Sequence, residues 1–254
     1  MIPIMRTSGF LLALCVPVAC VRADMITLNP PEDTTLYEAN NNSNGAGSHI
    51  HVGSTGGGFI RRGLLALDVS AIPAGSTINS AVLQLNMSRT SSLAQNVSLH
   101  RALSDWGEAG SDAGGNEGQG APGQLGDATW NFRDYDGAGG GTAWTTQGGD
   151  FDPDASDTLS VAGLGTYSWG SPGTTADVQG WLDTPATNFG WILIGNESVI
   201  RTTKRFDSGE NITAANRPQL TIDFTPIPEP GVAGLFILGG LSVLALRRMR
   251  PGRS

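Results

Sequence analysis

The sequence predicts an all-β protein built as one antiparallel β-sandwich. Gly and Pro, which end strands and form turns, supply 36 and 14 of the 254 residues. Apolar and polar residues alternate over residues 80–88 and 220–225, as they do in strands with one buried face. The charged fraction of 15% and the single Lys, Lys204, disfavour a helical bundle. The length allows one domain of roughly 200 residues and two end segments.

Two further segments are apolar throughout and predict central strands with both faces buried. They are residues 64–67 and residues 191–194, and turn-forming residues bound each of them. Residues 176–182 predict one or two helical turns. Other strands are expected at residues 34–38, 49–53, 97–103, 128–131 and 159–163.

A long segment rich in Gly and Asp interrupts the predicted strands at residues 107–149, and it is called the insert below. It holds 14 of the 36 Gly. A loop of this length inside a domain is unusual and often carries function. Because Trp130 and Trp144 lie within it, parts of the insert are expected to fold back onto the sandwich.

Residues 1–23 read as an export signal that forms an N-terminal helix. Arg6 is followed by an apolar stretch over residues 10–21 and by a small-residue cleavage site that leaves Asp24 as the first mature residue. Two alternatives stay open, namely lipoprotein processing at Cys20 and a membrane anchor. Both cysteines of the chain lie in this segment, so we expect the mature body to have no disulfide.

The C-terminal segment, residues 226–254, has three parts in order. Pro228-Glu229-Pro230 precedes an uncharged stretch over residues 231–246, and a cluster of Arg ends the chain. The uncharged stretch predicts a transmembrane helix of about 24 Å, with the Arg cluster on the cytoplasmic side. This tail resembles the PEP-CTERM sorting signal of Gram-negative bacteria.

The resemblance implies an exosortase-type processing enzyme as a partner, acting at Pro228-Glu229-Pro230. The protein would be anchored in the inner membrane transiently and then pass to the cell surface or the extracellular matrix. The alternative is a plain C-terminal anchor. In either case we expect residues 24–230 to face a non-cytoplasmic space.

Without the two ends, the charge balance of the chain is different. Six of the fifteen basic residues and none of the 23 acidic ones lie outside residues 24–230, so the formal charge of the body is −14 rather than −8. Such a surface repels phosphate backbones, and we therefore expect no nucleic acid partner.

Eight short motifs over residues 30–225 resemble, in order, a DNRLRE-type domain, which is also called disaggregatase-related. They lie at residues 61–68, 72–78, 81–85, 106–108, 128–131, 178–182, 188–191 and 206–210, the last followed by 217–220. The resemblance implies a jelly-roll-like β-sandwich on a secreted protein, and related modules bind acidic polysaccharides such as alginate. The long acidic insert and the small number of basic residues depart from that pattern.

Four carboxylates after the insert, Asp150, Asp152, Asp154 and Asp157, have a spacing that can wrap Ca²⁺. The EF-hand pattern itself fails, because Ala155 stands where that loop needs Gly. The alternative is a solvated acidic loop. Calcium is the cofactor that the sequence favours.

For glycan binding the sequence offers aromatic rings and basic groups. Trp144 and Trp169, set among small and polar residues, are the candidate platforms on which a sugar ring would stack. Arg201, Lys204 and Arg205 are candidates for clamping a carboxylated sugar. The alternative for this basic cluster is pairing with the many acidic residues.

A zinc site has weaker support. His49 and His51 share one face of a predicted strand, which is a geometry that permits zinc binding. Glu38 and Asp68 are the nearest residues in the sequence that would complete the ligand set, and the alternative is a pair of ordinary histidines.

Together these observations predict a non-catalytic, exported protein of the cell surface or extracellular matrix that binds polysaccharide. The first alternative is a purely structural matrix protein without a specific ligand. The second is a polysaccharide lyase or hydrolase. No nucleophile motif is present, but a carboxylate pair such as Asp105 and Glu108 would serve that chemistry.

Overall fold

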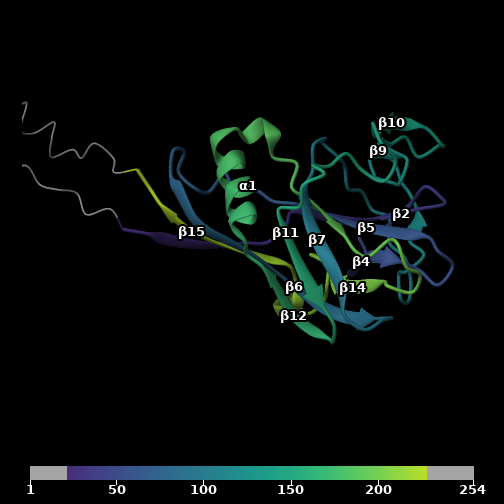
Figure 1. Ribbon diagram of the computed structural model, residues 1–254. Helices are drawn as coiled ribbons and strands as arrows, with labels where there is room; N and C mark the ends of the chain where they lie inside the picture. The colour runs from purple at the N-terminus through teal and green to yellow at the C-terminus, as the bar shows by residue number, and fades with distance from the viewer. Residues whose placement is uncertain (1–21, 228–254) are drawn as a thin grey trace, which may run out of the picture. The chain divides into compact units, whose positions relative to one another are not determined.

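Two antiparallel sheets enclose the main hydrophobic core in the computed structural model, which describes residues 22–227 (Figure 1). The strands of the first, the β6 sheet, are β1 (Asp24–Leu28), β4 (His49–Ser54), β6 (Thr77–Thr90), β12 (Gly165–Trp169), β14 (Lys204–Asp207) and β15 (Gln219–Thr225). The strands of the second, the β5 sheet, are β2 (Glu32–Tyr37), β5 (Ile60–Ala66), β7 (Gln95–Arg101), β11 (Asp157–Val161) and β13 (Trp191–Ile194). β4 also pairs with β5 at their shared hairpin, so hydrogen bonding runs through both sheets. The predicted all-β, sandwich-like fold is confirmed.

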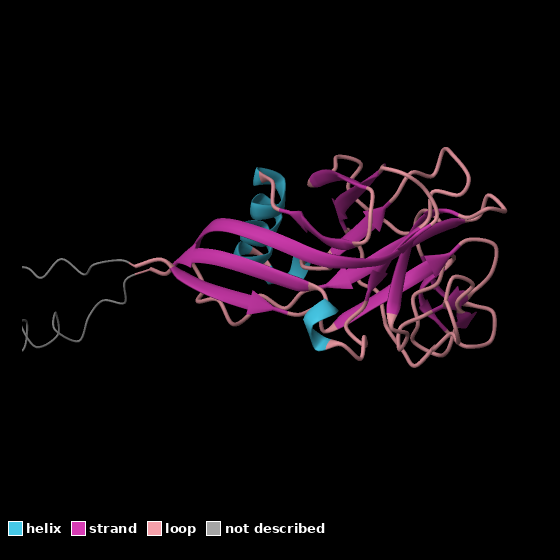
Figure 2. Cartoon of the chain, turned by 90° about the horizontal axis from the view of Figure 1, so that it is seen from below, coloured by secondary structure: helices cyan, strands magenta, loops and turns pink. Residues whose placement is uncertain are grey.

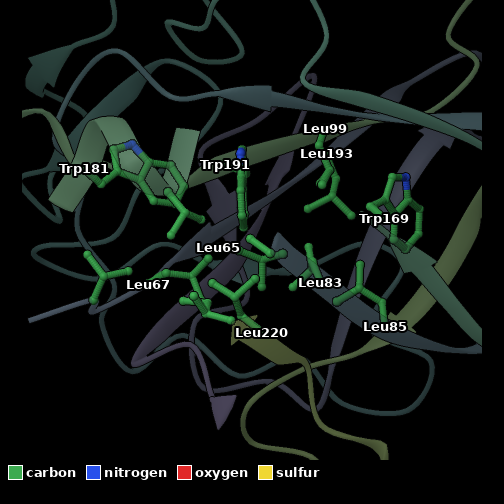
Figure 3. Close-up of a cluster of buried hydrophobic side chains, with 14 of the residues drawn as sticks. Leu65, Leu67, Leu83, Leu85, Leu99, Trp169, Trp181, Trp191, Leu193 and Leu220 are labelled. Atoms are coloured by element: carbon green, nitrogen blue, oxygen red, sulfur yellow. The ribbon is translucent and has the colours of Figure 1, made fainter. Parts of the chain in front are cut away.

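The main core lies between the two sheets, and β6 supplies its largest share. Ala81, Leu83, Leu85 and Met87 are at most 1% exposed, and the polar side chains between them face away from the core, as predicted. The same alternation buries three apolar side chains of β15. Leucines from both sheets meet between the strands, with Trp residues at the two ends of the cluster (Figure 3).

The two continuous apolar runs are buried on both faces, as predicted, because the insert covers the outer face of the β5 sheet. In β5, Leu65 faces the main core, whereas Leu64 faces a second cluster. In β13, Leu193 faces the main core and Ile192 faces the second cluster. The second cluster is closed by three tryptophans, of which Trp106 directly precedes the insert and Trp130 and Trp144 lie within it.

One α-helix covers an end of the core. Helix α1 (Pro172–Asp183) begins after Ser171, whose side chain accepts from the amides of Gly173 and Thr174 and so caps the helix. It contacts β6 and buries Val178 and Trp181, which places the predicted helical turns correctly. Two short 3₁₀ turns, η1 (Pro185–Thr187) and η2 (Ala214–Asn216), lie in the loops that follow.

Several predicted boundaries are wrong. Residues 128–131 form no strand, because Trp130 and Asn131 lie in a turn, and the strand starts one residue later as β9 (Phe132–Tyr135), paired with β10 (Gly141–Ala143). A second small pair joins β3 (Asn42–Ser43) to β8 (Ala121–Pro122). The sequence reading missed β1, β12 and β14, which are short or carry charged residues.

The two ends of the described chain leave from the same sheet (Figure 2). β1 pairs with β15, and Asp24 stands opposite Phe224. The predicted signal helix over residues 1–21, the Pro228-Glu229-Pro230 motif and the predicted transmembrane helix over residues 231–246 lie outside the described residues. Within residues 22–227, no helix has both the length and the apolar character needed to span a membrane.

Candidate anion-binding cleft

A cleft of about 260 Å³ opens where the β4–β5 hairpin, the end of β6, the start of β14 and the insert come together. Three arginines, Arg89, Arg201 and Arg205, line it, and we call it the arginine cleft. The buried ring of His51 and the insert residues Asn116, Gly118 and Gln119 contribute to its remaining walls. Arg201 and Arg205 were expected in this role from the sequence, whereas Arg89 was not.

Arg89 and Arg205 are directly opposite each other on the neighbouring strands β6 and β14. Like charges at such positions repel each other and destabilise the sheet. Burial lowers the pKa of Arg205, Asp207 acts against that shift, and Arg89 adds to it. The Nε of Arg205 donates to Ser88 Oγ over 3.1 Å, which fixes one side of its guanidinium. The two charges favour an anion between them.

Arg201 enters the cleft from a strained turn. Its φ is +63°, a left-handed conformation that residues other than Gly seldom adopt. Its amide donates to Thr55 O and its carbonyl oxygen accepts from Ser91 Oγ, each over 3.1 Å, and these bonds hold the conformation. A Cβ at Gly56 would make an ordinary van der Waals contact with the Arg201 side chain, at 3.6 Å, so Arg201 lies directly against Gly56.

None of the three cleft arginines forms an ion pair within the described residues. Elsewhere in residues 22–227, Arg62 pairs with Glu197 at 2.7 Å and Arg101 pairs with Asp152 at 3.2 Å. The cleft therefore concentrates unpaired positive charge in a body whose formal charge is −14. A planar guanidinium binds a carboxylate through two parallel hydrogen bonds, so the site suits carboxylate ligands.

His51 contributes a neutral ring to this site. The side chain is 4% exposed, and burial, followed by the nearby charge of Arg205, lowers its pKa to about 3. His49 and His51 do share a face of β4, as predicted. His49 Nδ1 lies 3.1 Å from Glu117 of the insert and Nε2 lies 3.6 Å from Asp207, and neither acid was foreseen.

The helpers named for a zinc site are occupied elsewhere. Glu38 accepts from the amide of Ile60, and Asp68 accepts from the amide of Ser70. Over residues 22–227, no three His, Cys, Asp or Glu side chains form a group that could hold a metal ion.

Lys204 lies beside the cleft but points away from it. The side chain is fully buried, and Nζ donates to Thr90 Oγ1 and to the carbonyl oxygens of Ser92 and Leu93, at 2.7, 3.1 and 2.7 Å. Burial lowers the pKa of this amine. Lys204 therefore fastens the turn after β6 and is not part of the surface that a ligand would meet.

The two candidate stacking platforms are buried. Trp169 is fully buried in the main core, where its Nε1 donates to Val97 O over 3.0 Å. Trp144 is 5% exposed in the second cluster and donates to Thr129 O over 2.8 Å. Neither ring presents a face on which a sugar could stack, and both serve to pack the fold.

The four carboxylates proposed for calcium make separate local contacts. Asp150 accepts from the amides of Thr145 and Thr146 and from Ser104 Oγ, at 3.0, 2.8 and 2.9 Å. Asp157 accepts from the amides after β12, and Asp152 pairs with Arg101, while Asp154 is exposed. The described structure does not bring these four residues to one point, and calcium binding by them stays a prediction.

Glu108 is a partly buried carboxyl group among other acidic residues. Burial raises its pKa to about 9, and the charges of Asp33 and Glu210 add to that effect. Asp105, its proposed partner in a hydrolase, lies near Glu32. Burial raises the pKa of Glu32, and the charge of Asp105 adds a smaller increase. The alternative of a hydrolase built on Asp105 and Glu108 stays a prediction.

No protein family model matches this chain, and no curated protein matches it at a significant level. The resemblances to a PEP-CTERM signal and to a DNRLRE-type domain therefore rest on the quoted residues. They stay predictions, as does the jelly-roll topology that the second resemblance implies.

Proposed function

We propose that this protein is exported, is displayed on the cell surface or in the extracellular matrix, and binds an acidic polysaccharide in the arginine cleft. The observation that carries the proposal is the gathering of Arg89, Arg201 and Arg205 at one place without acidic partners among residues 22–227. A uronate carboxylate would accept hydrogen bonds from two guanidinium groups and relieve their repulsion.

The acidic body restricts such binding to the cleft. The net charge of −14, which already includes the three arginines, repels an anionic polymer from the rest of the surface over about a Debye length, roughly 10 Å at 0.1 M salt. We therefore expect weak binding that salt reduces further. Nucleic acid binding is not proposed, because a phosphate backbone needs a long basic surface.

Calorimetric titration of the purified protein with an oligouronate tests this proposal. Arg89→Ala and Arg201→Ala are expected to remove most of the binding heat. Arg101→Ala is the matched control, since Arg101 has a partly exposed side chain but is already paired with Asp152. Unchanged affinity in both cleft variants, or no affinity in the wild type, would overturn the proposal.

The protein is also proposed to be non-catalytic. The same incubation, followed by size analysis of the polysaccharide, tests this part. Shortened product would assign the protein to the lyases or hydrolases, whereas a polymer of unchanged length supports binding alone.

Processing at both ends is compatible with the fold. Asp24 is the first residue of β1, and β15 ends at Thr225, three residues before the proposed sorting motif. Removal of residues 1–23 and of the chain after Pro228-Glu229-Pro230 would leave both strands intact. We propose an exosortase-type enzyme as the processing partner, with the inner membrane as a transient location.

Cell fractionation of a variant with all three motif residues replaced by Ala tests the sorting proposal. The variant is expected to stay in the membrane fraction, while the wild type reaches the surface or the medium. Equal release of the two proteins would refute processing at this motif.

A further inference from the structure

We propose that Glu117 is a positioning residue that fixes the insert wall of the arginine cleft, an inference that rests on the proposed function of that cleft. The wall consists of residues 116–119, and Asn116, Gly118 and Gln119 line the cleft directly. Glu117 does not line the cleft, so its effect on a ligand would be exerted through these neighbours.

The side chain and the backbone of Glu117 are both held by the sandwich. Oε2 accepts from Asn44 Nδ2 over 2.9 Å, and Oε1 lies 3.1 Å from His49 Nδ1. The carbonyl oxygen accepts from the hydroxyl of Tyr37 over 2.8 Å. One residue of the insert is therefore fastened to β2, to β4 and to the segment between them.

The two residues that follow are tied in the same way. Gly118 O accepts from Arg61 Nε over 3.2 Å, and Gln119 O accepts from Asn42 Nδ2 over 2.8 Å. These bonds place successive carbonyl groups of the wall against fixed points of the sandwich, with Glu117 at their start.

The backbone at Glu117 is strained, with a φ of +59°. Gly adopts this conformation without steric cost, and Glu does not. Such an outlier persists where the surrounding contacts over-determine it, and strained residues cluster at ligand sites. The contacts of the carboxylate give the reason for a Glu at a position that Gly would fill with less strain.

The carboxylate is charged in this setting. Burial alone would raise the pKa of Glu117, but the close contact with His49 and the hydrogen bond from Asn44 lower it below its ordinary value. A hydrogen bond to a charged group contributes more than one between neutral groups. Loss of the charge should therefore loosen the wall.

Two variants distinguish the contribution of the Glu117 carboxylate from that of the strained backbone. Glu117→Gln keeps the shape but loses the charge that faces His49. Glu117→Gly loses the side chain and relieves the strain. With an oligouronate as the probe, calorimetry is expected to show binding about tenfold weaker in Glu117→Gly and an intermediate loss in Glu117→Gln. If Glu117 served only to form a turn, its replacement by Gly would not weaken the binding of the oligouronate.

The control is Asp127→Asn in another part of the insert. Asp127 accepts from the amides of Ala109 and Gln124, at 2.8 and 2.7 Å, and does not line the cleft. This variant should lower the melting temperature and leave the affinity unchanged. If Glu117→Gly binds as tightly as the wild type, the inference is overturned.

Amide hydrogen exchange provides a readout without a ligand. In Glu117→Gly, exchange at the amides of residues 117 and 120, which donate to Gly114 O and to the carbonyl oxygen of residue 117 over 3.3 and 3.0 Å, is expected to become faster, while the strands of the core keep their protection. If the wild type binds no oligouronate, the proposed function fails, and exchange then decides the positioning role alone. Unchanged exchange at these residues would overturn it.

Discussion

The indole Nε1 of Trp191 donates a hydrogen bond to Asp177 Oδ2 over 2.7 Å and so joins β13 to helix α1. The same oxygen accepts from the hydroxyl of Ser156. Beside this bond, the rings of Trp181 and Trp191 pack with centroids 4.7 Å apart. The carboxylate thus fixes the helix over one end of the main core.

Asp177→Ala is expected to lower the free energy of unfolding by about 1–3 kcal/mol, because the N–H of Trp191 would stay buried without an acceptor. Denaturant titration measures the change. Asp183→Ala, at the exposed end of the same helix, is the control and should have little effect. Equal stabilities for the two variants would contradict the importance of this bond.

Lys204→Met tests the role assigned to the buried amine. Three acceptors, Thr90 Oγ1 and the carbonyl oxygens of Ser92 and Leu93, would lose their donor. We expect a loss of about 2 kcal/mol in the free energy of unfolding. Thr90→Val removes one of the three acceptors and should cost less. A Lys204→Met protein as stable as the wild type would refute the structural role.

Trp144→Ala is expected to release part of the insert. The change deletes a ring of the second cluster and should cost about 3–5 kcal/mol. Limited proteolysis within residues 107–149 should become faster. Leu125→Ala serves for comparison, since Leu125 lies in the insert but is 74% exposed. Similar cleavage rates in the two variants would show that Trp144 does not hold the insert.

Glu108 should make stability depend on pH. Its pKa is about 9 in the folded protein, against an ordinary value of 4.5, so the folded state binds more protons between these limits. The contribution of Glu108 to stability is full below pH 4.5 and is lost as the pH rises through 9. Glu108→Gln lacks this titration.

Denaturant titration across that range should therefore show a smaller decline with pH for Glu108→Gln than for the wild type. Parallel curves for the two proteins would indicate that Glu108 ionises in the folded state as it does in water.

Patterns over a few consecutive residues were sufficient to predict the strands whose burial follows such a pattern. A period of two identified the buried faces of β6 and β15, and the continuous run at residues 64–67 predicted burial on both sides of β5. β14 escaped prediction because Lys204 and Arg205 lie among its four residues. The acceptors that make a buried Lys tolerable come from the turn after β6, far away in the sequence.

The candidate site was only half visible in the sequence for a similar reason. Arg201 and Arg205 are close in the chain and were noticed together, whereas strand pairing alone brings Arg89 to Arg205. Trp169 lies among small and polar neighbours, which favoured an exposed ring. Neighbouring residues do not reveal which way a side chain points, and this one faces the core.

Strand β6 also sets a distance. Thr77, at its start, pairs with Thr225, the last residue of β15, and Arg89 lies twelve residues further along. At about 3.3 Å per residue, the strand measures roughly 40 Å between these points. If the protein is tethered through the residues after Thr225, the arginine cleft lies at the far end of this stiff strand. The cleft would then contact polymer that does not come close to the point of attachment.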